Sequence, residues 1–259
     1  MALKLATREY GDGPPLIILH GLFGSAQNWH SMAERLAATY HVVTCDLRNH
    51  GASPWSEQMT FPEMADDLET LIEARGLSPA SVLGHSVGGK TAMLTALKHS
   101  DLVERLIVVD IAPVDYEAPF LAYVRAMQAV DLAAATRRSA IDEQLAEVVP
   151  DAATRLFLLQ NLIERDGRAD WRINLAAIAA NMDRLLGFPD VAQFGYDGRA
   201  LFLSGAESDY IAPRYYGRIF ELFPQAEFAR IDDAGHYPHV EQPERFLASV
   251  VDFLESAYA

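Results

Sequence analysis

Residues 81–90 read SVLGHSVGGK, and this stretch decides the fold. An apolar run ends at Gly84, and Ser86 stands between Gly84 and Gly88 in the spacing G-x-S-x-G, directly before a run of good helix formers. This arrangement is typical of a nucleophile elbow, a sharp strand-to-helix turn that pushes a serine hydroxyl into solvent. Side chains two residues away would collide across the turn, which explains the glycines. The alternative is a serine that only caps the following helix.

Outward from this stretch, short β-rich runs alternate with helical periodicity. The expected strands cover 15–21, 41–46, 80–86, 105–113, 200–208 and 226–236, and the expected helices cover 28–39, 61–75, 87–99, 213–222 and 243–256. Nearly continuous apolar strands favour a sheet that is covered on both faces, hence an α/β fold with a doubly wound, mostly parallel sheet. Glycine, histidine, serine and aspartate cluster at the carboxyl ends of these strands, where open α/β sheets bind ligands.

The interval from Val114 to Pro189 breaks this alternation, because its pattern is helical throughout. A simple crossover between parallel strands needs only about a dozen residues, far fewer than this interval holds. We therefore expect residues 1–113 and 190–259 to form the core and residues 114–189 to form a helical cap over the strand ends.

Composition excludes several classes of protein. The chain has 259 residues, of which 50% are hydrophobic, enough for one large α/β domain. Its formal net charge of −15 repels polyphosphate, so no nucleic-acid partner is expected. No apolar run approaches the roughly 18 residues that span a bilayer, and the start of the chain lacks the apolar core of a signal peptide, so a cytoplasmic location without a membrane span is expected. Cys45, the single cysteine, is interpreted as a buried, unreactive thiol.

A serine hydroxyl is a poor nucleophile at neutral pH, so Ser86 needs a base within hydrogen-bond reach. In elbow hydrolases the chain order is serine, acid, histidine. His236 follows the last expected strand and precedes the C-terminal helix, where its Nε2 can point at Ser86. His239 is the alternative, but it follows Pro238 and is expected to face the helix start. No third ligand with plausible spacing joins the two histidines, so no metal is expected.

The acid that would orient His236 has several candidates. Ser208 occupies the usual acid position in the loop after ALFLS (200–204), and Asp209 comes one residue late. Asp110 closes the apolar run IVVD beside the elbow strand, where a carboxylate would be costly to bury without a partner such as an imidazolium. We favour Asp110, with Asp209 second and Glu207 or another residue third. Ser208 would then donate a hydrogen bond within the acid–histidine pair.

Acyl transfer also needs donors for the developing oxyanion. One is the backbone N–H of Val87 at the start of the elbow helix. The other is the N–H of Leu22, which follows the turn at His20-Gly21. Phe23 is a less suitable donor, and its ring is expected to line the acyl pocket.

Other conspicuous residues have structural interpretations. The stretch DLRNHGAS (46–53) lies at a strand end and is assigned to structural hydrogen bonding, and His85 is expected to pack under the elbow. Gly88-Gly89-Lys90 lacks the spacing of a phosphate-binding loop. Apolar side chains of the interval are assigned to the cap core, some of them also facing substrate: Phe157, Leu158, Trp171, Leu175, Met182 and Leu185.

Seven stretches together resemble the α/β-hydrolase superfamily, and among its members the small bacterial esterases and their mitochondrial relatives. They are HGLFGSAQNW (20–29), DLRNHGASP (46–54), GHSVGGKTAM (84–93), VVDIAPVDY (108–116), FLLQNLI (157–163), WRINLAAI (171–178) and DAGHYPHVEQPE (233–244). The resemblance covers essentially the whole chain. It implies the α/β-hydrolase fold with a helical cap inserted after the sixth strand, short-chain carboxylesterase or thioesterase activity, and no metal or organic cofactor. It also favours Asp110 as the acid and a serine at position 208, although Asp209 departs from the pattern.

The expected function is hydrolysis of short- to medium-chain acyl esters or thioesters through an acyl-enzyme on Ser86. The expected partner is thus a small-molecule substrate, and the chain would act as a monomer or homodimer. A C–C hydrolase, a lactonase or a perhydrolase could use the same three side chains. A protein from another class, a non-catalytic ligand-binding homologue, is the remaining alternative.

Overall fold

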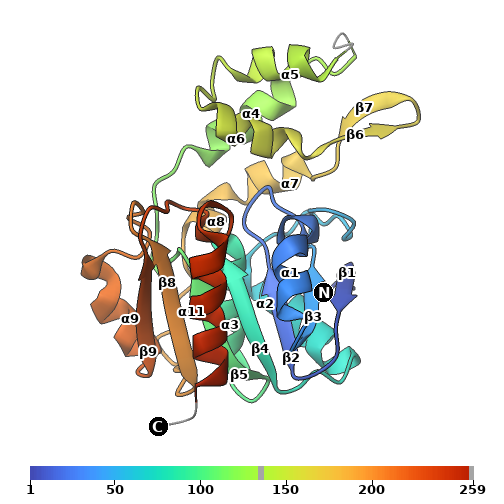
Figure 1. The fold of residues 1–259 in the computed structure, drawn as a ribbon. Helices are drawn as coiled ribbons and strands as arrows, with labels where there is room; N and C mark the ends of the chain where they lie inside the picture. Colours follow the sequence, from blue (N-terminus) through green and yellow to red (C-terminus); the bar gives the residue numbers. More distant parts are fainter. Residues whose placement is uncertain (134–136, 257–259) are drawn as a thin grey trace.

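The computed structural model describes residues 1–133 and 137–256. A seven-stranded sheet has the order β1-β3-β2-β4-β5-β8-β9 (Figure 1). Its strands are β1 (Thr7–Tyr10), β2 (Pro15–Leu19), β3 (His41–Cys45), β4 (Ala80–His85), β5 (Val103–Val109), β8 (Arg199–Gly205) and β9 (Ala226–Ile231). Only β1 runs antiparallel to its neighbour, so the expected doubly wound, mostly parallel sheet is confirmed. β1 was not expected, because TREY lacks an apolar run and no residue of this edge strand is fully buried.

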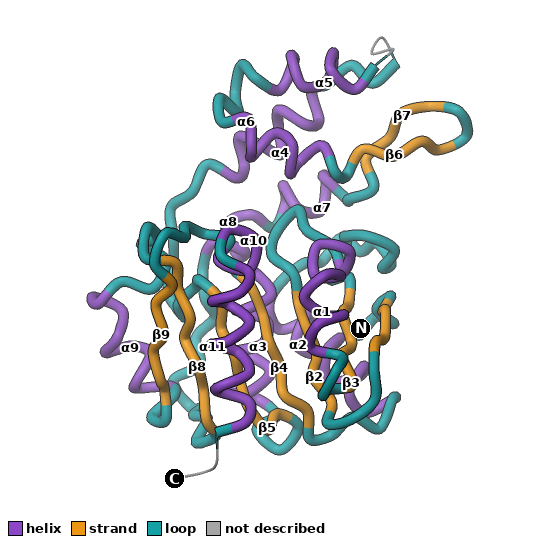
Figure 2. The backbone as a smooth tube through the Cα atoms, in the orientation of Figure 1, coloured by secondary structure: helices purple, strands orange, loops and turns teal. Residues whose placement is uncertain are grey.

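Helices cover both faces of the sheet, as Figures 1 and 2 show. α1 (His30–Leu36) and α11 (Pro243–Glu255) pack on one face through apolar side chains such as Leu36 and Phe246. α2 (Phe61–Ala74), α3 (Val87–Lys98) and α9 (Tyr216–Leu222) contribute to the core on the other face. Two short 3₁₀ helices, η1 (Ala26–Trp29) and η2 (Pro213–Tyr215), and the single turn α10 (Pro238–Glu241) complete this part. Burial on both faces explains why every residue of β4 is buried.

The segment between β5 and β8 lies over one end of the sheet (Figure 1). It holds α4 (Phe120–Ala129), α5 (Arg138–Leu145), α6 (Ala152–Leu159), β6 (Leu162–Arg165), β7 (Arg168–Trp171), α7 (Leu175–Ala180) and α8 (Met182–Leu186). We call this segment the cap. The expected boundaries at 113/114 and 189/190 remain predictions, and residues 134–136, which were also assigned to helix, lie outside the described residues.

The expectation of helix throughout the cap is wrong in one place. β6 and β7 pair as an antiparallel hairpin around Asp166-Gly167. Both of these residues have positive φ, 52° and 75°. An Asp-Gly pair with two positive φ angles is the preferred two-residue turn between antiparallel strands, so the turn chemistry overrides the helical pattern.

The position of the cap in the chain also needs correction. It follows the fifth strand, β5, and not the sixth. The reason is that a single strand, β1, precedes β2, while residues 1–6 form no strand. Among the described residues, no helix has both the length and the apolar character needed to cross a membrane.

Two chain crossings join the cap to the core, and hydrogen bonds tie them together. The Tyr116 N–H donates to the Leu186 carbonyl at 3.0 Å, and the Phe188 N–H donates to Asp115 Oδ1 at 2.8 Å. Lys90 Nζ, on α3, donates to the carbonyls of Leu186 and Gly187 at 2.8 and 2.6 Å. The cap is therefore anchored to the helix that begins at the elbow.

Candidate active site

Ser86 forms the junction between β4 and α3 in a conformation that few residues adopt. Its φ is 52° and its ψ is −118°, and its N–H donates to the Val109 carbonyl at 3.0 Å. A Cβ on Gly84 would lie 2.2 Å from the Gly88 carbonyl oxygen, and one on Gly88 would lie 2.5 Å from the His20 carbonyl oxygen. The expected collision across the turn is thus confirmed for Gly84, whereas Gly88 is required because its Cβ would meet the backbone at the end of β2. Strain of this kind costs about 1–3 kcal/mol and persists only where surrounding structure holds it.

Asp110 follows the neighbouring strand β5. His85 pairs with Val109 across β4 and β5, so Ser86 and Asp110 leave adjacent strand ends. The Asp110 N–H donates to the Leu203 carbonyl on β8 at 2.9 Å, and its φ of 51° turns the chain away from the strand. Its side chain is completely buried.

The buried carboxylate of Asp110 meets two side chains from distant loops. His236 Nδ1 lies 2.7 Å from Asp110 Oδ2, and the Ser208 hydroxyl donates to the same oxygen at 2.5 Å. Asp209 and Glu207, the other acid candidates, are exposed. The geometry therefore unites His236 with Asp110 and Ser208, and it leaves Asp209 and Glu207 at the surface.

Hydrogen bonds and ring contacts hold the loop that carries His236 in place. His85 Nε2–H donates to the His236 carbonyl at 2.8 Å, and the two imidazole rings lie 4.7 Å apart. The ring of Tyr210 stacks on His236 with centroids 4.3 Å apart. Glu241 accepts the N–H groups of Gly235 and Tyr237 at 2.8 and 3.0 Å. These contacts set the His236 ring beside the residue that precedes Ser86.

His239 has a different environment. Its ring stacks on Trp29 with centroids 4.1 Å apart and planes 9° apart, and its side chain is buried. Burial, with a smaller contribution from His236, lowers the pKa of His239 to about 3. His239 is thus a neutral packing residue within α10.

The loop 20–25 passes next to Ser86 and is held from two directions. The Phe23 N–H donates to His50 Nε2 at 3.1 Å, and the Phe23 carbonyl accepts Nδ2 of Asn161 from the cap at 2.8 Å. Phe23 has a positive φ of 64°. Because its N–H is occupied by His50, Phe23 has no backbone donor left for a ligand. Within the described residues, the Leu22 N–H has no acceptor.

Residues of the stretch 46–53 accept hydrogen bonds from this loop and from Ala26 next to it. His50 Nδ1–H donates to the Arg48 carbonyl at 3.0 Å, which leaves Nε2 as an acceptor, and burial lowers the pKa of His50 to about 3. Asp46 accepts the N–H groups of Ala26 and Ala52 at 2.7 and 2.8 Å. The assignment of this stretch to structural hydrogen bonding is confirmed.

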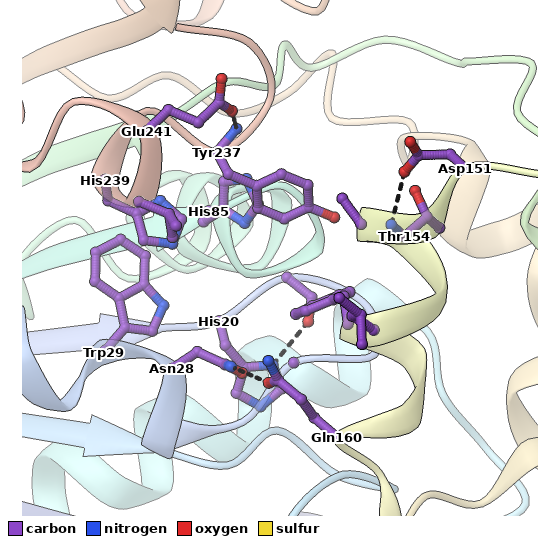
Figure 3. A pocket seen from close by; sticks show the side chains of 16 residues that line it. His20, Asn28, Trp29, His85, Asp151, Thr154, Gln160, Tyr237, His239 and Glu241 are labelled. Atoms are coloured by element: carbon purple, nitrogen blue, oxygen red, sulfur yellow. Dashed lines mark hydrogen bonds between the residues drawn. The ribbon is translucent and has the colours of Figure 1, made fainter. Parts of the chain in front are cut away.

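Two spaces border this constellation. The first, which we call the chamber, has a volume of about 20 Å³ and is lined by Ser86, Leu22 and Val87 with side chains that include Tyr210. The second, which we call the groove, has a volume of about 470 Å³. It lies between α6 of the cap and the region of η1 and α10 (Figure 3).

Phe157 lines the groove, where its ring lies 5.5 Å from that of Tyr237. Phe23 borders neither space. It is 4% exposed and packs against Phe120, a chamber residue, with ring centroids 6.1 Å apart.

One group of potential metal ligands occurs among the described residues, away from these spaces. Ligand atoms of Asp66, Glu69 and His99 lie within 4.8 Å of one another. Lys98 Nζ lies 2.8 Å from Asp66 and His99 Nδ1 lies 3.1 Å from Glu69. The Lys98–Asp66 ion pair and the His99–Glu69 contact join α2 to the end of α3, and the lysine already neutralises one of the carboxylates.

Comparison with known proteins now decides the family. A family model described as alpha/beta hydrolase fold matches residues 14–243. This chain is an α/β-hydrolase. It is 42% identical over 249 residues to the sn-1-specific diacylglycerol lipase ABHD11 of Mus musculus, covering 93% of this chain and 81% of the relative. It is 31% identical over 247 residues to Esterase YbfF of Escherichia coli strain K12, covering 94% of each. A solved structure titled Marine microorganism esterase superposes with a TM-score of 0.92 at 37% identity, covering 97% of this chain and all of that one.

Sequence reasoning did not single out several residues that build the site of this α/β-hydrolase. Asn161 contacts the loop 20–25, and Tyr210 contacts the His236 ring. Both contacts join segments that are far apart in the chain. Asn161 did stand in FLLQNLI, one of the stretches that carried the family resemblance. Tyr210 carried no comparable signal.

Proposed function

We propose that this α/β-hydrolase is a serine carboxylesterase that also accepts thioesters. The observation that supports it best is the contact between Asp110 Oδ2 and His236 Nδ1 at 2.7 Å, on a loop fastened to the residue before Ser86. In this proposal Asp110 holds the imidazole so that Nε2 can serve as the base for Ser86. The esterase and lipase names of the relatives agree with this reaction class.

The proposed reaction has two halves. His236 Nε2 takes the Ser86 proton while Oγ bonds to the carbonyl carbon, and the resulting oxyanion receives the N–H groups of Leu22 and Val87. Val87 is the first residue of α3, so its N–H has no partner within the helix. The occupied N–H of Phe23 supports Leu22 as the second donor.

The leaving alcohol or thiol then takes the proton from His236, and an acyl group remains on Ser86. Water attacks this acyl-enzyme with His236 again as the base, and the carboxylic acid leaves as Ser86 regains its proton. The two halves of the proposed reaction add up to hydrolysis of the ester and need no oxidant, reductant or metal.

Ser86→Ala tests the proposal, with hydrolysis of p-nitrophenyl acetate and labelling by a fluorophosphonate probe as readouts. Both should disappear, because the probe and the ester require the same oxygen nucleophile. Ser249→Ala, on α11, is a matched control that keeps both. Retention of more than about a few per cent of activity in Ser86→Ala would defeat the proposal, since the residual rate after loss of the nucleophile is small.

A further inference from the structure

The chamber is the space that has to receive the acyl group. Once the alcohol has left, the proposed intermediate carries only the acyl group on Ser86. Of the chamber and the groove, only the chamber is lined by Ser86, together with Leu22 and Val87. Its volume is about 20 Å³, whereas a single buried water needs roughly 10–15 Å³ of such volume. Even an acetyl group therefore requires that one wall of the chamber moves.

The wall formed by the core has little room to move. α3 packs directly on the end of β2, because a Cβ on Gly88 would lie 2.5 Å from the His20 carbonyl oxygen. It also packs on the chain after β5, because a Cβ on Gly89 would lie 2.6 Å from Ile111 Cγ2. Contacts this close leave no side chain between α3 and these segments that could rearrange to open the chamber. The opening therefore has to come from the cap.

The short helix α8 supplies two side chains of the cap wall. Met182 and Leu185 on this helix line the chamber, and they are 1% and 3% exposed. α8 spans only five residues, too few for a helix that is stable on its own. Its position therefore depends on its contacts with the rest of the protein.

A side-chain contact holds each end of α8. At its start, Asn181 Nδ2 donates to the Glu57 carbonyl at 2.8 Å. At its end, Lys90 Nζ donates to the carbonyls of Leu186 and Gly187 at 2.8 and 2.6 Å. Lys90 belongs to the first turn of α3, so the second contact fixes the end of α8 relative to the elbow.

The surroundings of Lys90 suit an ammonium group. Its side chain is 1% exposed, and two of the three N–H donors of a lysine ammonium are used by the carbonyls at the end of α8. The ring centroids of Tyr116 and Phe61 lie 4.9 and 5.6 Å from Nζ, within the range of cation–π contacts. Such partners compensate for the lost hydration of a buried charge. The charge in turn strengthens the two hydrogen bonds to α8.

Other contacts hold the side of the chamber next to His236. Tyr210 lines the chamber and stacks on His236, and its carbonyl accepts the Tyr116 hydroxyl at 2.6 Å. The Tyr116 oxygen in turn accepts the Ala112 N–H at 2.9 Å. Loss of the Lys90 ammonium should therefore release α8 while the proposed base stays in place.

We propose, resting on the serine esterase function above, that Lys90 is a positioning residue that determines which acyl groups the enzyme accepts. By holding the end of α8, Lys90 keeps Met182 and Leu185 against the chamber, and the chamber admits only short acyl chains. The substrate class is thus esters with a short acyl group, and the selection depends on the Lys90 ammonium.

Lys90→Met tests this inference, because methionine keeps an apolar stem but cannot donate to the carbonyls at the end of α8. p-Nitrophenyl acetate and p-nitrophenyl hexanoate share their alcohol, so the ratio of their kcat/KM values reports on the acyl group alone. We expect Lys90→Met to raise the hexanoate-to-acetate ratio by about tenfold, the effect of burying about two further methylene groups, mainly through a lower KM for the hexanoate. Lys98→Met, at the other end of α3, is the matched control and should keep the wild-type ratio, because Lys98 pairs with Asp66 and does not line the chamber.

A double-mutant cycle shows whether Lys90 acts through α8. Leu185→Ala enlarges the chamber directly and should raise the same ratio. If Lys90→Met acts by releasing α8, the two increases should be less than multiplicative in the double variant, because both changes remove the same obstruction. Fully multiplicative increases would place the action of Lys90 elsewhere and would overturn the inference.

The wild type offers a second test that does not depend on the stability of a variant. Burial lowers the pKa of Lys90 to about 7, and the Asp115 carboxylate opposes part of this effect. Burial raises the pKa of the Tyr116 hydroxyl, which therefore stays neutral. Carboxyl and guanidinium groups as a class titrate outside the range of about pH 6 to 8.5. Those on the adjoining α2 and α8 are Glu63, Asp183 and Arg184.

Loss of the Lys90 charge should weaken both bonds to α8, because charge-assisted hydrogen bonds are about twice as strong as neutral ones. The wild-type hexanoate-to-acetate ratio should consequently rise between about pH 6 and 8.5, and in Lys90→Met it should stay at its raised value. Titration of His236 cancels in this ratio, since both esters require the same base.

The outcomes separate this inference from the proposed function. Retained activity in Ser86→Ala would show that the serine esterase function itself is wrong. If Ser86 is required but Lys90→Met keeps the wild-type ratio, or Lys98→Met raises the ratio equally, only the role of Lys90 is overturned. If Lys90→Met fails to fold, as judged by fluorophosphonate labelling of Ser86, a wild-type ratio that does not change with pH overturns it.

Discussion

Asp110 Oδ2 lies 2.7 Å from His236 Nδ1, although 126 residues separate the two in the chain. The carboxylate is completely buried, while 19% of the His236 side chain is exposed. Such a pair fixes which imidazole nitrogen carries the proton, because Nδ1–H must face the carboxylate. Nε2 is then the nitrogen left to act as a base.

Replacement of this carboxylate should be the most damaging change after loss of the nucleophile. Asp110→Asn offers an amide that cannot stabilise the imidazolium, and we expect kcat to fall by about 10⁴ with p-nitrophenyl acetate. Asp209→Asn is the matched control, because Asp209 is exposed and has the same chemistry. A large loss in Asp209→Asn with little in Asp110→Asn would move the acid to position 209.

Ser208 should contribute through Asp110. Asp110 Oδ1 is buried and accepts no hydrogen bond from the described residues, so the Ser208 hydroxyl is the carboxylate's contact besides His236. Ser208→Ala removes a hydrogen bond to a charged group, and we expect kcat to fall by about tenfold with little change in KM. Steady-state kinetics of Ser208→Ala and Ser208→Thr check this, since threonine keeps the hydroxyl. Equal rates for Ser208→Ala and the wild type would show that the bond does not matter for turnover.

His50 should position the loop that carries the Leu22 N–H. In His50→Leu the buried Phe23 N–H loses its acceptor, and the loop can shift away from Ser86. We expect a fall in kcat of about 10², as for the loss of one oxyanion donor, with a smaller change in KM. His50→Gln keeps an acceptor and should recover part of the rate. His30→Leu, at a half-exposed histidine on α1, controls for a general effect of removing a histidine. A fall confined to KM would contradict a role in the transition state.

His239 should make the protein sensitive to acid. Its pKa is about 3 in the folded state, against about 6.5 in an unfolded chain. Its contribution to stability is complete above about pH 6.5 and is lost as the pH falls toward 3, at up to about 1.4 kcal/mol per pH unit.

His239→Phe keeps a ring to stack on Trp29, removes a buried Nδ1 that has no partner among the described residues, and cannot be protonated. Urea unfolding should show its stability advantage over the wild type growing between about pH 6.5 and 4. An advantage that does not change with pH would contradict this origin.

The sequence alone determined the layers of the molecule and its elbow. Apolar strands alternating with helices gave the doubly wound sheet, because the period of apolar residues depends only on neighbours along the chain. The same holds for Ser86 and Gly84, because a Cβ on Gly84 would collide with Gly88 within the turn itself. The hairpin at Asp166-Gly167 was equally local and readable, but the surrounding helical pattern obscured it.

Only the tertiary structure decided which residues distant in the chain come into contact. Asp110 and Asp209 are both aspartates after apolar strands, and the sequence could favour one but not bring either to His236. The ends of β4, β5, β8 and β9 meet at one edge of a twisted parallel sheet, and the resulting geometry buries Asp110 against His236 while Asp209 faces solvent. The partners of Phe23 and the sizes of the chamber and the groove likewise depend on how the cap packs on the core, because side-chain packing between distant segments leaves no periodic trace in the chain.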